Sequence, residues 1–327
     1  MTPLRIGILG AARIAPAAVV QPARAIAGVE VVCVGARSLA SAQDFAAAHG
    51  IRTANEGYAA VAGSGDVDLV YVALPTSLHA EWTIRAAEAG KHVLCEKSFA
   101  MDSAEAAAMV VAGQAAGVRI IEAFHHRYHP AFTTFLDIVH SGAIGRLTAI
   151  DAEFSAPIAM TPGEFRYSPA LGGGAMRDLG CYALSWCLSL DDTPIAALAV
   201  DAVLTQGGVD ESVTARLDFA SGVTARVRTS MAAGQAIVRH LRVEGSKGTI
   251  TFDNPLAPHT GSRIIREGAP DLVFGEASGA TYFHQLAAIA QAITTGAPLP
   301  TEGAAILRQQ AALDHICAQF GQEGQHL

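Results

Sequence analysis

The chain has 327 residues, of which 51% are hydrophobic, and its formal net charge is −8. This length favours two domains over one core. The sequence has no basic stripe with interleaved aromatic residues and no uninterrupted run of eighteen apolar residues, which argues against nucleic acid partners and membrane spans. A strand is predicted from residue 4 onward, so we expect no signal peptide and a cytoplasmic location.

Strands and helices alternate over the first 122 residues. Five apolar runs predict strands, at 4–9, 29–36, 69–74, 92–95 and 118–122. Three stretches between them predict helices, at 17–27, 41–49 and 79–89. Strands separated by helices of this length imply right-handed crossovers and a parallel sheet. We therefore expect residues 1–122 to form a doubly wound α/β domain of the Rossmann type.

The first predicted strand ends in a run of small residues. Gly10, Ala12 and Ala15 form a G-x-A-x-x-A version of the dinucleotide-binding fingerprint. Gly10 would make the tight turn, and the small side chains would let a pyrophosphate approach the N–H groups at the start of the next helix. We expect Gly10, Ala12, Arg13 and Ile14 to contact the bound cofactor.

The end of the second predicted strand indicates which cofactor binds. NAD-binding proteins usually place an acidic residue there to hold the ribose 2′-hydroxyl. This chain has Arg37 and Ser38 instead. A guanidinium group binds a 2′-phosphate through charge-assisted hydrogen bonds. We therefore predict NADP as the cofactor, with NAD as the alternative.

Polar residues also follow two later strands. Pro75 and Thr76 come after the strand at 69–74, and Glu96 and Lys97 come after the strand at 92–95. Ligands of an open parallel sheet bind outside the carboxyl ends of its strands. Lys97 is therefore a candidate for chemistry, whereas the alternative is an ordinary solvated lysine.

The pattern changes after residue 122. A helix is predicted at 131–141, and two more at 282–295 and 302–320. Alternating runs predict strands between them, at 147–154, 197–205, 212–219, 223–230, 240–244 and 249–252. Consecutive strands joined by short turns indicate an antiparallel sheet. We expect residues 123–327 to form an α+β domain built on a broad, mainly antiparallel sheet, which binds substrate and mediates self-association.

A glycine-rich loop in the second domain precedes a second candidate site. Asp178 and Tyr182 follow the three glycines at 172–174 and are four residues apart, so they share one helix face. A carboxylate and a phenol on one face can handle a proton. A purely structural contact between the two residues is the alternative. The role of Arg177 is not evident from the pattern.

Histidines gather where the predicted domains join, in the run E-A-F-H-H-R-Y-H-P at 122–130. This spacing matches no defined metal site, and we expect no metal. Pro130 suits the first position of the following helix. His125 and Arg127 are candidates to line a substrate pocket, as is Arg166 on the loop before the glycines. A plain core or surface role is the alternative for each.

Two motifs in the chain resemble those of the Gfo/Idh/MocA family of NAD(P)-dependent oxidoreductases. The first is the family pattern P-x-x-x-H followed by A-G-K-H-V-x-x-E-K-P, matched here through Pro75, His79, Glu96 and Lys97. The match departs at Ser98, where the family usually has proline. The second motif, G-G-G-x-x-x-D-x-G-x-Y, matches residues 172–182.

The resemblance implies a catalytic set of Lys97, Asp178 and Tyr182. Tyr182 would exchange the proton of a substrate hydroxyl, because a nearby Lys97 charge favours the phenolate. Asp178 would orient the hydroxyl or the lysine. The resemblance also implies that part of the cofactor site lies in residues of the first motif, namely Pro75, Thr76, His79, Glu96 and Lys97.

The expected activity is hydride transfer between NADP(H) and a carbinol or carbonyl carbon of a sugar or polyol. Family members often bury one sheet face against another copy, so we expect a homodimer or larger homo-oligomer. A trans-dihydrodiol dehydrogenase and a non-catalytic NADP-binding sensor are the alternatives. Ser98 supports the sensor, since proline would fix the backbone that aims Lys97.

Overall fold

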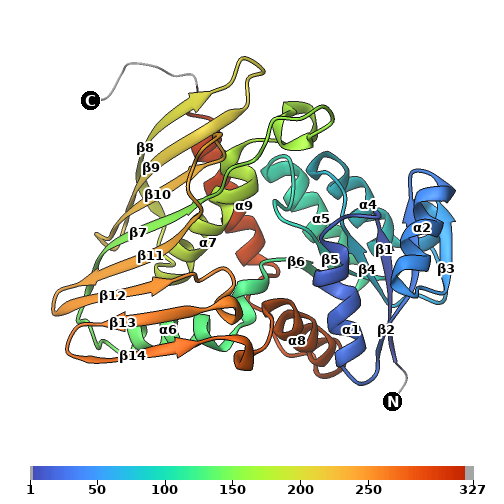
Figure 1. Ribbon diagram of the computed structural model, residues 1–327, viewed down its shortest axis with the longest axis horizontal. Coiled ribbons are helices and arrows are strands. Elements are labelled where there is room, and N and C mark those ends of the chain that lie inside the picture. The colour runs from blue at the N-terminus through green and yellow to red at the C-terminus, as the bar shows by residue number, and fades with distance from the viewer. Residues whose placement is uncertain (1–2, 321–327) are drawn as a thin grey trace. The chain divides into compact units, whose positions relative to one another are not determined.

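A computed structural model describes residues 3–320 of the chain, which fall into two compact units (Figure 1). The first unit comprises the chain up to Tyr128 together with Thr281–Arg308, and the second comprises His129–Ala280 together with the chain from Gln309. The sequence predicted a single division after residue 122. The units are instead discontinuous, because the segment at 281–308 packs with the first 128 residues of the chain.

The described strands of the first unit form a six-stranded parallel sheet in the order β3-β2-β1-β4-β5-β6. Their bounds are β1 Leu4–Leu9, β2 Val29–Ala36, β3 Thr53–Glu56, β4 Leu69–Val72, β5 His92–Cys95 and β6 Ile120–Glu122. This order reverses between β1 and β4, where Rossmann sheets bind dinucleotides. The sequence analysis missed β3, because its residues Thr-Ala-Asn-Glu are polar and it lies at the edge of the sheet.

Helices cover both faces of this sheet and give it two apolar cores. The helices are α1 Gln21–Ala25, α2 Leu39–His49, α3 Ala59–Ala62, α4 His79–Glu88, α5 Ser103–Ala116 and α8 Thr281–Thr295. One core joins α4 and α5 to side chains such as Val70 and Val93. The other joins α1 and α8 to side chains such as Ile8 and Tyr71. The sheet is therefore buried on both faces, as expected of parallel strands.

Arg119 ties the segment after α8 to the sheet. Its guanidinium donates to both carboxylate oxygens of Glu302, at 2.7 and 3.0 Å, and to the carbonyl oxygens of Ala292 (2.8 Å) and Ala297 (2.6 Å). Its backbone N–H donates to Nδ1 of His92 at 3.0 Å. One partly buried side chain thus joins residues that are far apart in sequence.

The described strands of the second unit form an eight-stranded sheet in the order β14-β13-β12-β11-β7-β10-β9-β8. Their bounds are β7 Leu147–Ser155, β8 Ile195–Leu204, β9 Asp210–Phe219, β10 Thr224–Ser230, β11 Val238–Gly245, β12 Gly248–Asp253, β13 Ser262–Arg266 and β14 Ala269–Phe274. Every pair is antiparallel except β7 with β10. The prediction of a broad, mainly antiparallel sheet is confirmed, although β13 and β14 were missed.

Side chains of this sheet alternate between an apolar and a charged face. Along β7, Ile150, Ala152 and Phe154 are buried, whereas Asp151 and Glu153 lie on the opposite face. The helices of this unit are α6 Pro130–His140, α7 Cys181–Leu190 and the C-terminal part of α9 Ala304–Cys317. Both α6 and α7 lie against the apolar face (Figure 1). None of the described helices is long and apolar enough to cross a membrane.

Candidate active site

The turn after β1 leaves no room for a side chain at its glycine. Gly10 has φ of 102°, in the left-handed region, and a Cβ atom there would collide with the carbonyl oxygen of Ala73. Its N–H donates to the carbonyl oxygen of Gly35 at 2.8 Å. The chain then turns directly into a helix that begins at Pro16. This close backbone approach is the geometry that the fingerprint predicts for a pyrophosphate site.

The residues after β2 divide between two roles. Arg37 is exposed, and its charge acts on Tyr58. Ser38 is the N-cap of α2, where its Oγ accepts the N–H of Ser41 at 3.3 Å. Strand β3 brings Glu56 beside Ala36, directly before Arg37. The register therefore places an acidic residue beside the residue that precedes the predicted phosphate-binding arginine, which the sequence analysis could not foresee without β3.

His79 connects the loops that follow β4 and β5. Its side chain is fully buried, with Nε2 2.8 Å from the carbonyl oxygen of Leu74 and Nδ1 3.0 Å from that of Ser98. The peptide bond between Lys97 and Ser98 is cis. Burial lowers the pKa of His79. Both ring nitrogens of His79 are directed at backbone carbonyl oxygens of the protein. We predicted that His79 contacts the cofactor, but its side chain instead holds the loop that carries Lys97.

Glu96 is held at the carboxyl end of β5 by a tyrosine from β4. Its Oε1 accepts the hydroxyl of Tyr71 at 2.5 Å, and its Oε2 accepts the backbone N–H of Lys97 at 3.3 Å. Tyr71 itself is fully buried. The carboxylate thus braces the backbone from which the Lys97 side chain projects.

A second carboxyl group at this edge escaped the sequence analysis. Glu122 ends β6 directly beside Cys95 of β5, and only 3% of its surface is exposed. Burial, reinforced by the charge of Glu96, raises its pKa to about 8, while Arg127 and Lys97 act in the opposite direction. The sequence did contain a signal for Glu122, since an acidic residue at the end of an apolar strand is unusual. The sequence analysis considered it only within the histidine run.

The histidine run does not form a metal site among the described residues. No group of three or more histidine, cysteine, aspartate or glutamate side chains in residues 3–320 is arranged to hold an ion. His125 Nδ1 lies 2.8 Å from Oγ1 of Thr281, and its ring packs on Tyr282. Burial lowers the pKa of Arg127 to about 10. His125 and Arg127, the two residues of the run that we predicted to line a pocket, both belong to the first unit.

His129 has a different role from its neighbours. Its Nδ1 accepts the N–H of Ala131 at 3.0 Å, which makes it the N-cap of α6. Its Nε2 lies 3.1 Å from the carbonyl oxygen of Gly279. The third histidine of the run thus starts a helix of the second unit, and Pro130 takes the first helical position as predicted.

The glycine loop of the second unit is fixed by backbone contacts. A Cβ atom at Gly173 would collide with the carbonyl oxygen of Arg166, and one at Gly174 would collide with the carboxylate of Asp210. Asp210 also accepts the N–H of Met176 at 2.6 Å. Burial raises the pKa of Asp210 to about 6. These contacts hold the loop at the start of the helix that it precedes.

Asp178 forms an ion pair within its own unit. Its Oδ2 accepts Nε–H of Arg166 at 2.7 Å, and Arg166 also pairs with Glu164 at 2.9 Å. Asp178 lies in a π-helical turn, Met176–Gly180, that runs into α7. Such turns occur often at functional sites. Arg166, which we predicted to bind substrate, is therefore engaged with the predicted catalytic carboxylate.

Tyr182 lies in the first turn of α7, four residues after Asp178. Its ring packs edge-on against Phe154 of β7, with the ring centroids 5.7 Å apart. The strand thus fixes the ring plane from one side. Arg177, between the two motif residues, acts electrostatically on Asp210 and Cys317, which gives it a local charge partner in the same unit.

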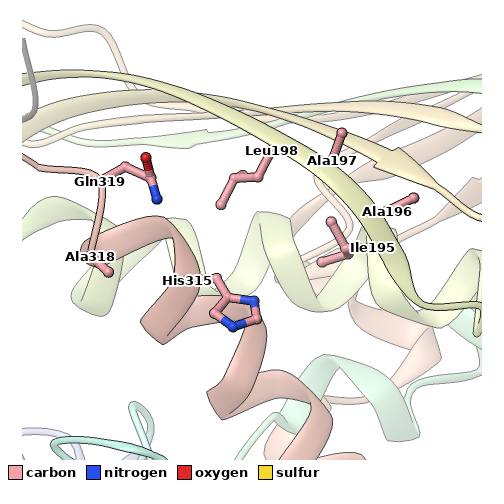
Figure 2. Close-up of a pocket in the computed structure, with 7 residues that line it drawn as sticks. All are labelled: Ile195, Ala196, Ala197, Leu198, His315, Ala318 and Gln319. Carbon is pink, nitrogen blue, oxygen red and sulfur yellow. The ribbon is translucent and has the colours of Figure 1, made fainter. Parts of the chain in front are cut away.

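A separate hollow of about 270 Å³ lies between β8 and the end of α9 (Figure 2). Strand residues Ile195–Leu198 line one side, and His315, Ala318 and Gln319 line the other. None of the predicted site residues borders it, and its walls are mostly apolar. We therefore do not connect this hollow with the chemistry.

The predicted site residues fall into one group in each unit. In the first unit, the turn at Gly10, the loop at Pro75 and Lys97 lie at the carboxyl edge of the parallel sheet, where Glu122, which was not predicted, also lies. In the second unit, Asp178 and Arg166 are in contact, and Tyr182 follows on the same helix.

Family models match both halves of the chain. The model described as an oxidoreductase family with an NAD-binding Rossmann fold matches residues 4–124. The GFO/IDH/MocA C-terminal domain model matches residues 132–251.

Individual relatives agree with these matches. An uncharacterised oxidoreductase of Rhizobium meliloti is 33% identical over 309 residues, which cover 91% of each chain. A D-xylose 1-dehydrogenase (NADP(+)) of Haloferax volcanii is 34% identical over 247 residues, covering 76% of this chain and 75% of that one. The structure is similar to a 3-ketoreductase from Actinomadura kijaniata in complex with NADP and TDP-benzene, with 30% identity, a TM-score of 0.84 and coverage of 97% and 98%.

Proposed function

The chain belongs to the GFO/IDH/MocA family of oxidoreductases, and we propose that it moves a hydride between NADP(H) and a carbinol or carbonyl carbon of a sugar. The observation that carries this proposal is the edge of the parallel sheet, where the Gly10 turn and Lys97 follow β1 and β5. The similarity to a xylose dehydrogenase and to a sugar ketoreductase supports the sugar as substrate class.

The residues present fit an NADP molecule. A side chain is excluded at Gly10, so a pyrophosphate could approach the backbone there. Arg37 is exposed at the end of β2, where it could bind a 2′-phosphate. We propose that Ala12, Arg13 and Ile14 contact the cofactor from the loop after Gly10, and that Pro75 and Thr76 do so from the loop after β4.

Ser38 and His79 support the cofactor site without contacting the cofactor in this proposal. Their polar atoms are engaged by the cap of α2 and by backbone carbonyl oxygens. We therefore assign them to holding the loops that carry Arg37 and Lys97. Glu96 has the same function for Lys97, since it accepts the lysine's backbone N–H.

We assign the proton transfer of the reaction to side chains of this protein. Bound NADP(H) supplies only the hydride donor or acceptor. We propose that Tyr182 takes the proton of the substrate hydroxyl during oxidation and returns it during reduction, with Lys97 stabilising the phenolate by its charge. Asp178, held by Arg166, orients the hydroxyl. His125 and Arg127 remain candidates to line the substrate pocket.

The test is a substrate panel of aldoses, inositols, nucleotide-linked keto sugars and aromatic trans-diols, followed by the absorbance of NADPH. Turnover of a sugar or polyol with NADP(H) supports the proposal. Turnover restricted to aromatic diols would favour a dihydrodiol dehydrogenase. Tight NADPH binding without turnover of any class would favour a sensor.

We also propose that the protein forms a homodimer or larger homo-oligomer in the cytoplasm. The charged face of the eight-stranded sheet supports this, because α6 and α7 lie on its other face. On the charged face, Arg228 pairs with Asp151 at 2.9 Å and with Glu153 at 3.2 Å. Such paired charges can pack against a second copy more readily than single ones. A cytoplasmic location would give access to the NADPH pool, and cell fractionation tests it.

A further inference from the structure

Glu122 is a buried carboxyl group that the proposed mechanism does not use. The register of β5 and β6 places it beside Cys95, so it lies one residue back from Glu96 and two from Lys97. Its own backbone is fixed on both sides: its N–H donates to the carbonyl oxygen of Thr301 at 2.9 Å, and the next residue, Ala123, donates to that of Cys95 at 2.8 Å. The position of the carboxyl group is therefore set by the sheet.

The Glu122 carboxylate also reaches the loop that carries Lys97. A hydrogen bond with the backbone of Phe99, two residues beyond the lysine, acts to lower the pKa of Glu122 against the effect of burial. Glu96 braces the same loop from its other end, at the N–H of Lys97. Two carboxyl groups therefore hold the short segment 96–99, one from its own strand and one from the neighbouring strand.

The titratable groups around Glu122 come from β5 with its loop and from the turn after β6. The strand and loop at β5 contribute the Cys95 thiol, the Glu96 carboxylate and the Lys97 ammonium group, and the turn after β6 contributes Arg127. Burial raises the pKa of Cys95, so the thiol stays neutral. Lys97 thus has two carboxyl groups within electrostatic reach, and an ionised Glu122 would share its charge.

We propose that Glu122 is a positioning residue for Lys97, which fixes the lysine loop through Phe99 and, once ionised, draws the lysine's charge away from the reacting oxygen. This inference rests on the proposed function, in which Lys97 stabilises a phenolate at Tyr182. The neutral carboxyl group leaves the charge of Lys97 available. When this group ionises, its proton passes to solvent and the resulting carboxylate competes for the charge of Lys97. Activity is therefore lost on the alkaline side as Glu122 ionises.

Stability gives a readout that does not depend on turnover. The pKa of Glu122 is about 8 in the folded protein, against an ordinary value of 4.5. Between these two values the folded state holds a proton that the unfolded state has lost, so stability falls as the pH rises through this window and is level above it. A glutamine at this position cannot titrate and should abolish that component.

Two variants of Glu122 separate the loop contact from the charge. Glu122→Gln keeps an acceptor for Phe99, so kcat at pH 7 should stay within about twofold of the wild type. Because glutamine cannot ionise, the alkaline limit of kcat/KM should move up by about one pH unit. Glu122→Ala loses the acceptor as well and should lower kcat at pH 7 by about tenfold. Glu88→Gln, on the exposed end of α4, is the control and should change neither quantity.

Thermal unfolding of the same proteins from pH 5 to pH 9 completes the experiment. Glu122→Gln should match the wild type at pH 5 and exceed its Tm by roughly 3 °C or more at pH 9. An alkaline limit that is the same in the wild type and in Glu122→Gln overturns the inference, whatever the Tm values. If the wild type turns over no sugar, the proposed function fails, and equal Tm values across the pH range would then overturn the ionisation of Glu122 separately.

Discussion

Several candidate residues use their polar atoms to hold the protein itself. Ser38 caps a helix, His79 faces two backbone carbonyl oxygens, and Asp178 pairs with Arg166. Substituting one of these residues would disturb a loop as well as any ligand contact. Tyr182 and Arg37 are better probes, because one has a hydroxyl that can be removed without changing the ring and the other is exposed at the surface.

Replacement of Tyr182 by phenylalanine tests the proton transfer. The ring still packs on Phe154, so the fold should be unchanged, whereas kcat should fall by about 10²-fold or more because a general acid–base is lost. Calorimetric titration should give the same NADPH affinity as the wild type. Near-normal turnover of the true substrate would remove Tyr182 from the mechanism and leave Lys97 as the proton carrier.

The Arg37→Asp variant tests cofactor choice. It removes a donor for the 2′-phosphate and adds a negative charge beside Glu56, so NADPH binding should weaken by about 100-fold while NADH binding changes less. Arg52→Asp is the control, since Arg52 precedes β3 at the opposite end of the sheet and should leave both affinities unchanged. Tighter binding of NADH than of NADPH by the wild type would show that Arg37 does not select the cofactor.

At the scale of elements, the strands with a clear apolar pattern were predictable, whereas three strands were missed. β1, β2 and β5 lie at the predicted residues, because buried parallel strands are apolar throughout. β3, β13 and β14 were missed, since their pattern depends on a neighbouring strand. Glu122 was missed for a related reason: its significance comes from the register with β5, which a single sequence does not specify.

Arg119 bonds to the carbonyl oxygen of Ala292 in α8 and to the segment that follows this helix, so it is a candidate to hold α8 in the first unit. Arg119→Met should lower the free energy of unfolding by about 3 kcal/mol, because it leaves the Glu302 carboxylate without its bidentate partner in a partly buried position. Denaturant titration of the single variants and of the double variant with Glu302→Gln should show strong coupling.

The pair of Arg85 with Glu81 on α4 provides the matched control. It is also an arginine–carboxylate pair, at 3.1 Å, but its side chains are 57% and 46% exposed. Arg85→Met should therefore cost less than about 0.5 kcal/mol. Equal losses for Arg119→Met and Arg85→Met would mean that the Arg119 network does not hold α8.

At the scale of the whole molecule, each unit contains one part of the proposed chemistry. The first carries the nucleotide turn and Lys97, and the second carries Asp178 and Tyr182. The fold class was predictable because strand–helix alternation and strand–strand succession are local patterns. The return of residues 281–308 to the first unit was not, since nothing local distinguishes a helix that packs on its own sheet from one that packs on another.

Self-association is expected to involve the charged face of the eight-stranded sheet. Sedimentation analysis at micromolar concentration should give a mass of two or more chains. Arg228→Glu places three acidic groups together on that face and should shift the mass toward a single chain. Arg24→Glu, in the first unit, should not. A wild-type protein that sediments as one chain would contradict the proposed assembly.

The discontinuity of the first unit also sets the order of events during biosynthesis. α8 supplies Leu286 and Ile289 to the core that contains Ile6 and Ile8. When the amino-terminal strands leave the ribosome, α1 and the residues before it can cover only part of that side of their sheet. The part that α8 buries stays uncovered until Thr281–Thr295 has been translated. The nucleotide-binding unit is thus the first to be started, but it is not finished until Arg308 has been translated. Cellular NADPH can stabilise only those chains whose translation is almost complete.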